Sequence, residues 1–403
     1  MEQVLTSSRF NTRDDIYRFL QVFDGLSLFT TNGTLWKKQR KYISPLLGSK
    51  YMEHYFFAIK KNAKVLVSKL RDKVDEPELD IMYYLKSCYT DIVTEILMGF
   101  NPEAQNGKLD EIMNVVDRMY ILVHARMMKL WLHPDFTFQL SSNGKEQKKG
   151  RDIFYKFLAK GIDLIESKRI KNSFAGRRCI LEELMIAKHN NLDLYGDQNL
   201  SDHASTLYSA SEDTIKSTCS FLLLVLGMHP DIQDKLAKEI IETIGIPTEK
   251  ITYKDLAKLK YLDMCIKETL RLFPIGPYIL RKVVEDVQMC GRTIPKDCTL
   301  VLSFYNLQRS AKYWEKPNEF YPEHFSPHLV AQRHPYAFLP FSAGARSCPG
   351  QLFAYVAIKT VAVAILQQYI IEADGTLQDI KLKADISIRP INNFKIRIRK
   401  RNI

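Results

Sequence analysis

A long apolar helix near the middle of the chain limits the folds that this sequence can adopt. The spacing of apolar residues predicts a helix over residues 201–227, and its second half is apolar on almost every side. A helix without a polar face must be buried by other elements on most of its surface. His229 and Pro230 end this helix, and Pro230 suits the first turn of another helix over residues 231–244.

Length and composition are those of a large globular protein. Of the 403 residues, 46% are hydrophobic and 26% are charged, which excludes a disordered chain, a collagen and a simple coiled coil. We expect one large mixed domain or two intimately packed ones. Basic residues exceed acidic ones by 58 − 46 = 12, which favours an acidic partner surface such as anionic lipid, nucleic acid or an acidic protein. A mild charge bias without any partner is an equally open interpretation.

The cysteines and the apolar runs argue against several other classes. The seven cysteines contain no C-x-x-C pair, so neither a zinc site nor a disulfide framework is indicated, and a reducing compartment fits best. The apolar run over 221–228 is too short to cross a bilayer, and Lys359 interrupts the run over 356–366. The first residues lack the basic and apolar regions of a signal peptide.

Helices dominate the first part of the chain, and short strands are predicted only after it. The polar stretch 141–149 predicts an exposed loop between two helices. Alternation over 283–301 predicts short strands, and the aromatic and proline-rich stretch 312–340 predicts an ordered loop. A last helix over 350–369 precedes a basic strand over 395–399, so the fold class is mainly α with small β-sheets. Further helices are predicted over 51–70, 81–97, 153–165, 181–187 and 260–272.

The ten residues from Phe341 to Gly350 carry the strongest chemical signal. Gly344 and Gly350 flank Cys348 and permit positive φ angles and a close approach of the backbone to a flat group. An apolar helix follows, so its N-terminal dipole, together with Arg346, favours a thiolate at Cys348. Phe341 can cover the site and keep it dry. A thiolate on such a loop is a suitable ligand for haem iron.

The pattern F-x-x-G-x-R-x-C-x-G in this segment resembles the haem loop of the cytochromes P-450. The resemblance implies haem b as cofactor, with Cys348 as the axial iron ligand. It also implies a single domain over residues 1–403, with the mainly helical fold of that family.

A helix pair before the strands supports the resemblance. Glu268 and Arg271 lie at i and i+3 and share a helix face, which by itself is compatible with an ordinary surface ion pair. By position they resemble the family's K-helix motif, whose role is structural. The family usually completes this network with an arginine in P-E-R-F, whereas this chain has His324 there, which cannot make the bidentate contact of an arginine.

Further cations resemble the residues that hold the haem propionates. Trp36 and Arg40 lie at i and i+4, one above the other on a predicted helix, and resemble the family's W-x-x-x-R motif. A guanidinium suits a carboxylate, and the indole N–H is a donor. Arg281 also resembles a propionate ligand, and Arg346 is a further candidate.

The long helix carries a stretch that resembles the family's oxygen-activation motif. Asp213 and Thr214 match its acid and alcohol, and we expect them to relay protons. Side chains that compete for backbone hydrogen bonds here favour a local distortion of the helix. Ser211 replaces the usual glycine, and Ile215 replaces the second hydroxyl residue.

The implied function is that of a haem-thiolate monooxygenase. Such an enzyme takes electrons from NADPH through a reductase and inserts one oxygen atom from O2 into an apolar organic substrate. The pattern is most similar to insect and vertebrate microsomal fatty-acid-type members. That similarity implies the cytoplasmic face of the endoplasmic reticulum and peripheral membrane contact, and nothing resembles a nucleic-acid module.

The start of the chain, together with Ser211 and His324, motivates an alternative interpretation. Trp36 already lies in the W-x-x-x-R helix, so the anchor, the hinge, the first helix and the first two strands of the family are expected to be missing. An incomplete sheet would expose strand edges near 278–304. One alternative is therefore a truncated, non-catalytic haem- or lipid-binding remnant or a gene fragment. Another alternative is a haem-thiolate enzyme that uses peroxide or rearranges a peroxide substrate without a reductase, but the intact pair of Asp213 and Thr214 argues against it.

Overall fold

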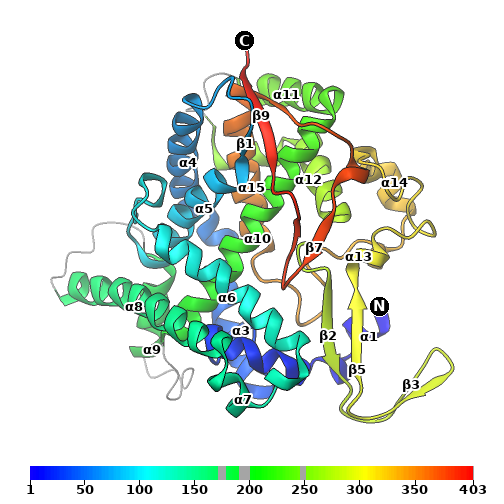
Figure 1. Cartoon of the computed structure of the whole chain (residues 1–403). Coiled ribbons are helices and arrows are strands. Elements are labelled where there is room, and N and C mark those ends of the chain that lie inside the picture. The colour runs from blue at the N-terminus through cyan, green and yellow to red at the C-terminus, as the bar shows by residue number, and fades with distance from the viewer. Residues whose placement is uncertain (171–177, 190–199, 246–250, 403) are drawn as a thin grey trace.

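Helices surround one long central helix, α10 (Leu200–Met228), in the computed structural model, which describes residues 1–170, 178–189, 200–245 and 251–402 (Figure 1). Helices α5 (Ile81–Met98) and α15 (Gln351–Gln368) pack against α10 along much of its length. The predicted central helix is therefore confirmed. The remaining helices are α1 (Glu2–Thr6), α2 (Gln21–Asp24), α3 (Gly33–Leu46), α4 (Ser49–Arg71), α6 (Asp110–Met128), α7 (Asp135–Leu140), α8 (Ser142–Ile170), α9 (Ile180–His189), α11 (Pro230–Ile244), α12 (Lys260–Leu272), α13 (Phe304–Leu307) and α14 (Pro327–Gln332).

The strands of the described residues form four small antiparallel sheets at the edges of this helical body. The register aligns Leu79 with Ile396, and Ile371 with Ile398, in the three-stranded sheet β1-β9-β6. Leu280 pairs with Val301 in the sheet of β2 and β5. The strands are β1 (Leu79–Asp80), β2 (Tyr278–Lys282), β3 (Val287–Met289), β4 (Arg292–Ile294), β5 (Thr299–Ser303), β6 (Tyr369–Glu372), β7 (Leu382–Ala384), β8 (Ile388–Pro390) and β9 (Lys395–Lys400), with β3 paired to β4 and β7 to β8.

The main hydrophobic core follows α10 and α15. Phe221 on α10 stacks on Phe273, with ring centroids 4.3 Å apart and planes at 7°. Helix α15 is the one described helix that is long and apolar enough to cross a membrane, but 78% of it is buried inside the protein, as expected of a core helix. Its Lys359 is buried and forms an ion pair with Asp263 at 3.0 Å.

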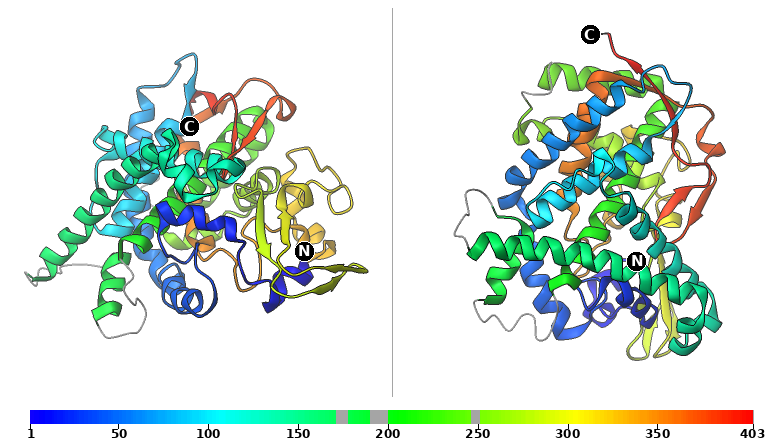
Figure 2. Two further views of the ribbon diagram at one scale, coloured as in Figure 1. Left: turned by 60° about the horizontal axis from the view of Figure 1, so that its bottom comes forward. Right: turned by 60° about the vertical axis from the view of Figure 1, so that its left-hand side comes forward.

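The polar stretch 141–149 is a helix, so the predicted loop is wrong. Helix α8 begins at Ser142 and runs across α6 at the outside of the molecule (Figure 2). The hydroxyl of Ser141 accepts a hydrogen bond from the Gly144 N–H and so caps the first turn. Glu146 then pairs with Arg118 of α6 at 2.6 Å. Most of these polar residues thus lie on the outer face of a helix, whereas Gln147 is buried.

The first residues of the chain lie against the cysteine loop and the β2-β5 sheet. Arg13 forms an antiparallel bridge with Arg281, and the Thr12 carbonyl accepts from Lys282 N. This segment therefore covers part of the edge of β2. Among the described residues no strand pairs with the outer edge of β5, where Val301 is 64% exposed. The expected open edge is therefore present on β5, whereas the edge of β2 is partly covered.

Gly344 has a φ of 72°. We predict that Gly344→Ala destabilises the protein by more than the cost of holding an alanine at such a positive φ. A Cβ at this position would lie 1.9 Å from the Leu5 carbonyl oxygen, so α1 would have to move away. Gly291 is a matched control, because its φ is 74° and a Cβ there would meet nothing within 4 Å. Thermal unfolding should show a loss of about 1–2 kcal/mol for Gly291→Ala and a clearly larger loss for Gly344→Ala. Equal losses would contradict the proposed contact.

Candidate active site

The cysteine loop is built by backbone hydrogen bonds directly before α15. The Cys348 N–H donates to the Phe341 carbonyl at 2.9 Å, and the Ser347 N–H donates to the Gly344 carbonyl at 3.0 Å. These contacts require the positive φ of Gly344. Gly350 is the N-cap of α15, so the thiol lies close to the positive end of that helix, as the sequence predicts.

The surroundings of Cys348 act on the pKa of its thiol in opposite directions. Burial raises the pKa of the thiol, whereas the Gly350 N–H and the Arg40 guanidinium oppose that rise. Cys348 is nevertheless an exposed residue, so a bound group can reach it.

Helix α10 is exposed at one place along its length. Only Ala210 and Thr214 are exposed within this helix, which the structure describes from end to end. They are one turn apart and so lie on the same face. This accessible strip, on a helix that is otherwise buried or half-buried, can therefore be reached by a bound group.

Four arginines gather beside the cysteine loop. The Arg40 guanidinium donates to the Ser347 carbonyl at 2.7 Å. The Arg346 guanidinium lies 3.8 Å above the Trp36 ring. Arg281 and Arg13 come from β2 and from the segment before α2, and they are joined by their backbone bridge. The structure thus brings together the cations that the sequence predicts and adds Arg13.

This arginine cluster (Arg13, Arg40, Arg281 and Arg346) has no acid of its own. None of the four forms an ion pair with a carboxylate in the part of the chain that the structure describes. Burial and the neighbouring arginines lower the pKa of Arg346 to about 9. Burial and Arg13 lower the pKa of Arg281 to about 10. The Nε atom of Arg13 is buried without a hydrogen-bond partner. Such a cluster is a binding site for an anion with several oxygens.

The Glu268–Arg271 pair is fully buried on α12. Two hydrogen bonds of 2.7 and 2.8 Å join the guanidinium to the carboxylate, and both side chains are 0% exposed. Arg271 also donates to the carbonyls of Gln308, Pro317 and Glu319. The pair therefore holds the segment that leads toward the cysteine loop, and the alternative of a surface pair is excluded.

His324 takes a place in this network. Its Nδ1 lies 3.0 Å from Glu268 Oε1, which also accepts the Tyr321 N–H at 2.9 Å. Arg333 supplies a nearby cation: it stacks on the Trp314 ring at 3.8 Å and donates to the His324 carbonyl. The carboxylate of Glu268 thus has partners beyond Arg271, although the usual arginine is replaced.

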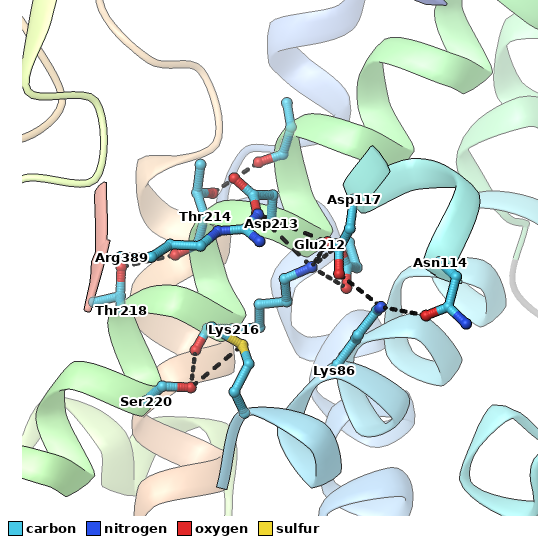
Figure 3. Close-up of polar contacts among 12 residues, drawn as sticks. Lys86, Asn114, Asp117, Glu212, Asp213, Thr214, Lys216, Thr218, Ser220 and Arg389 are labelled. Atoms are coloured by element: carbon cyan, nitrogen blue, oxygen red, sulfur yellow. Dashed lines mark hydrogen bonds and ion pairs between the residues drawn. The ribbon is translucent and has the colours of Figure 1, made fainter. Parts of the chain in front are cut away.

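Asp213 points away from Thr214 into a buried network of charges (Figure 3). Arg389 of β8 donates to Asp213 Oδ1 at 2.5 Å, and Lys216 lies 3.7 Å from the same oxygen. The Thr214 hydroxyl donates to the Ala210 carbonyl at 2.7 Å, on the accessible strip. The two residues are neighbours in sequence but face different surroundings. The expected distortion does not interrupt the helix, because α10 is α-helical throughout.

Lys216 is the centre of that network. It is 1% exposed and contacts Glu212 and Asp117 at 2.8 Å each. Burial alone would lower the pKa of Lys216, but the surrounding carboxylates outweigh it and raise that pKa. Lys86 and Arg389 approach Asp117 as well, at 2.7 and 3.7 Å, so three acids face three cations. The Glu212–Lys216 spacing of four was a readable signal in a helix predicted to be buried, whereas nothing in the sequence links Arg389 or Asp117 to α10.

The comparisons with known proteins agree with this site. The family model "Cytochrome P450" matches residues 1–397. Mouse "Cytochrome P450 4V2" is 31% identical, and the alignment covers all of this chain and 79% of that protein. Drosophila melanogaster "Cytochrome P450 4c3" is 29% identical, with coverage of 100% and 78%. The solved structure "Crystal structure of cytochrome P450DA heme domain" superposes with a TM-score of 0.84 at 20% identity, over 99% of this chain and 85% of that one. The match to the family model and the match to the mouse protein do not favour the alternative of a non-catalytic remnant.

We predict that Lys216→Met destabilises the protein by about 3–5 kcal/mol at neutral pH, because it leaves buried carboxylates unpaired. Glu212 has no other cation within ion-pair distance in the described ranges. Its unpaired carboxylate is therefore the main source of the lost stability. The loss should shrink as the pH falls toward about 5, since protonation neutralises that carboxylate. Urea unfolding at both pH values measures this effect. The half-exposed pair Lys267–Asp263 gives the control, and Lys267→Met should cost less than ~1 kcal/mol at either pH.

Proposed function

The chain belongs to the cytochrome P450 family and is a haem-dependent monooxygenase, and we propose that Cys348 is the axial ligand of its haem iron. The cofactor is haem b, and electrons come from NADPH through a reductase. The bound haem supplies the redox chemistry by which one oxygen atom of O2 enters an apolar organic substrate. The observation that carries the ligand proposal is the position of Cys348, an exposed residue in the loop directly before α15.

The residues around this sulfur fit a planar, dianionic cofactor. The arginine cluster lacks acidic partners of its own, so two propionates would relieve the repulsion among its four cations. We assign Arg13, Arg40, Arg281 and Arg346 to the propionates, with Trp36 beneath Arg346. Phe341, Gly344 and Gly350 form the loop around the iron ligand. Arg13 is included in this set because of its position in the structure, since the sequence did not indicate it.

Thr214 and Asp213 have separate proposed roles. The Thr214 hydroxyl lies on the accessible strip of α10, where it can hold or pass a proton at Oγ1. The Asp213 carboxylate is engaged by Arg389, so it acts on a proton only when that contact opens. Glu268 and Arg271 remain structural, because they tie α12 to the carbonyls of Gln308 and Pro317. The chain as a whole works as one domain.

We propose that the reductase binds the α3 side of the cysteine loop. Lys37 and Lys41 are exposed on α3, and Arg40 of the same helix contacts the loop at Ser347. Positive charge next to the ligand loop favours an acidic reductase surface and fast association. This proposed contact would account for part of the excess positive charge of the chain.

An exposed apolar patch supports membrane contact. The segment between α6 and α8 exposes Met128 (66%), Leu130 (76%), Trp131 (68%), Phe136 (73%) and Leu140 (63%). Exposed apolar side chains gathered in one short segment mark interaction surfaces. The exposed Lys129 lies among them and suits anionic headgroups. We propose that this patch rests on the cytoplasmic face of the endoplasmic reticulum membrane.

Cys348→Ser should abolish thiolate ligation, because a serine hydroxyl is not a thiolate donor. The measurement is the absorption spectrum of the reduced, carbon-monoxide-bound protein, in which thiolate ligation gives a strongly red-shifted Soret band. Cys290→Ser, which changes another exposed cysteine, should leave that band unchanged. A thiolate-type band in Cys348→Ser would overturn the assignment.

Replacing both Trp131 and Phe136 by serine should weaken binding to anionic lipid vesicles by roughly tenfold or more, since each buried aromatic ring contributes about 1.5–3 kcal/mol. Vesicle flotation measures the bound fraction. Tyr83→Ser is a control, because Tyr83 is 58% exposed on α5, outside the patch. Unchanged flotation of the double variant would contradict this contact.

A further inference from the structure

A short segment before α3 is held on α10 by a row of hydrogen bonds. We call residues 21–31 the strap; it begins with α2 and ends just before α3. Asp202, Ser205, Thr206 and Ser209 of α10 are spaced by three, one and three residues, so they share one helix face. Ser205 Oγ donates to the Phe23 carbonyl at 2.8 Å, Thr206 Oγ1 to the Asp24 carbonyl at 3.2 Å, Ser209 Oγ to Asp24 Oδ1 at 3.0 Å, and Leu26 N to Asp202 Oδ2 at 3.0 Å.

The other end of the strap joins the arginine cluster. The Thr31 carbonyl accepts from Arg346 at 3.0 Å, and the next residue, Asn32, accepts from Arg346 at 2.7 Å. Gln39 of α3 donates to the Leu26 carbonyl at 3.1 Å. The strap therefore links the face of α10 beside Ala210 to the cations that hold the cofactor in the proposed function. A change in the attachment of the strap would therefore affect both the face of α10 beside Ala210 and the arginine cluster.

Asp24 is the unusual member of this attachment. It is 3% exposed, and no described cation forms an ion pair with it. The groups that face it are themselves acidic or neutral: Asp202 on α10, Tyr120 on α6 and Tyr155 on α8. The nearby cation of α8, Arg151, lies over the Tyr155 ring at 4.8 Å instead. A buried carboxylate in these surroundings is costly in its ionised form.

The protonation of Asp24 falls in the physiological range. Burial raises the pKa of this carboxyl to about 7; Asp202 adds to the rise, and the Ser209 hydrogen bond opposes it. Once the strap is released into water, the same carboxyl has its ordinary pKa of 3.8. The closed strap therefore binds the proton more tightly than the open one. Its attachment is strongest at low pH and weakens as the pH rises from about 4 to about 7.

We propose that Asp24 is a protonation-controlled lock, which holds the strap on α10 when the carboxyl is neutral and lets it open when the carboxyl ionises. The opening would lie next to Ala210 and Thr214, the accessible strip of α10. The lock thus controls access to the site by proton concentration. Its effect on the site rests on the proposed function, but the opening of the strap does not.

Hydrogen exchange of the haem-loaded protein tests the lock without any turnover. The readout is the protection of the backbone amides of residues 25–31, corrected for the intrinsic pH dependence of exchange. In the unaltered chain this protection should fall by roughly tenfold or more between about pH 5.5 and about pH 7.5 and then level off, from the linkage of the two protonation equilibria. In Asp24→Asn, which mimics the neutral carboxyl, it should stay constant.

Two controls make the outcome decisive. Asp152→Asn removes an exposed carboxyl of α8 and should keep the pH dependence of the unaltered chain. The amides of the β6-β9 pair, which no strap residue contacts by hydrogen bond, should show no such fall. An equal fall in Asp24→Asn, or a fall of equal size in the β6-β9 amides, would overturn the lock. Loss of the Cys348 assignment alone would leave this result standing.

Discussion

Three buried arginines and the half-buried Arg40, without a carboxylate between them, set the main constraint on this structure. Arg346 gathers the Asn11 and Thr31 carbonyls and the side chain of Asn32, so the cluster ties the first thirty residues to the cysteine loop. The pKa values of Arg346 and Arg281 are lowered because burial and like charges disfavour their charged forms. This unbalanced positive charge is the basis of our proposal that the two propionates of the haem bind here.

The charges on the opposite side of Thr214, around Lys216, are balanced within the protein itself. Lys216, Lys86 and Arg389 face Asp117, Glu212 and Asp213, so this network is neutral without any ligand. It joins α5, α6, α10 and β8 behind the accessible strip. This balanced network joins elements of the scaffold, whereas the unbalanced arginine cluster is the one that we propose to bind the cofactor.

Asp24 belongs to neither group. It is a buried acid with hydroxyl partners in place of cations, and Gly25 beside it lies so close to Asp202 that a Cβ would be 2.0 Å from its carboxyl carbon. The close approach of the strap to α10 therefore forces two carboxyl groups into one neighbourhood. That arrangement is tolerable when one of them carries a proton, which gives the contact its dependence on pH.

The sequence by itself determined the helical core, the cysteine loop and the identity of the main cations. Apolar periodicity is enough to place α10 and α15, and local spacing is enough to place Cys348, because both depend on neighbours along the chain. The sequence did not show that the polar stretch 141–149 begins helix α8, because an exposed helix start and a loop share the same composition. Only the tertiary structure brought Arg13 to Arg281, and Arg389 and Asp117 to α10. It also turned Asp213 away from Thr214, because adjacent helix positions point about 100° apart and packing decides what each one meets.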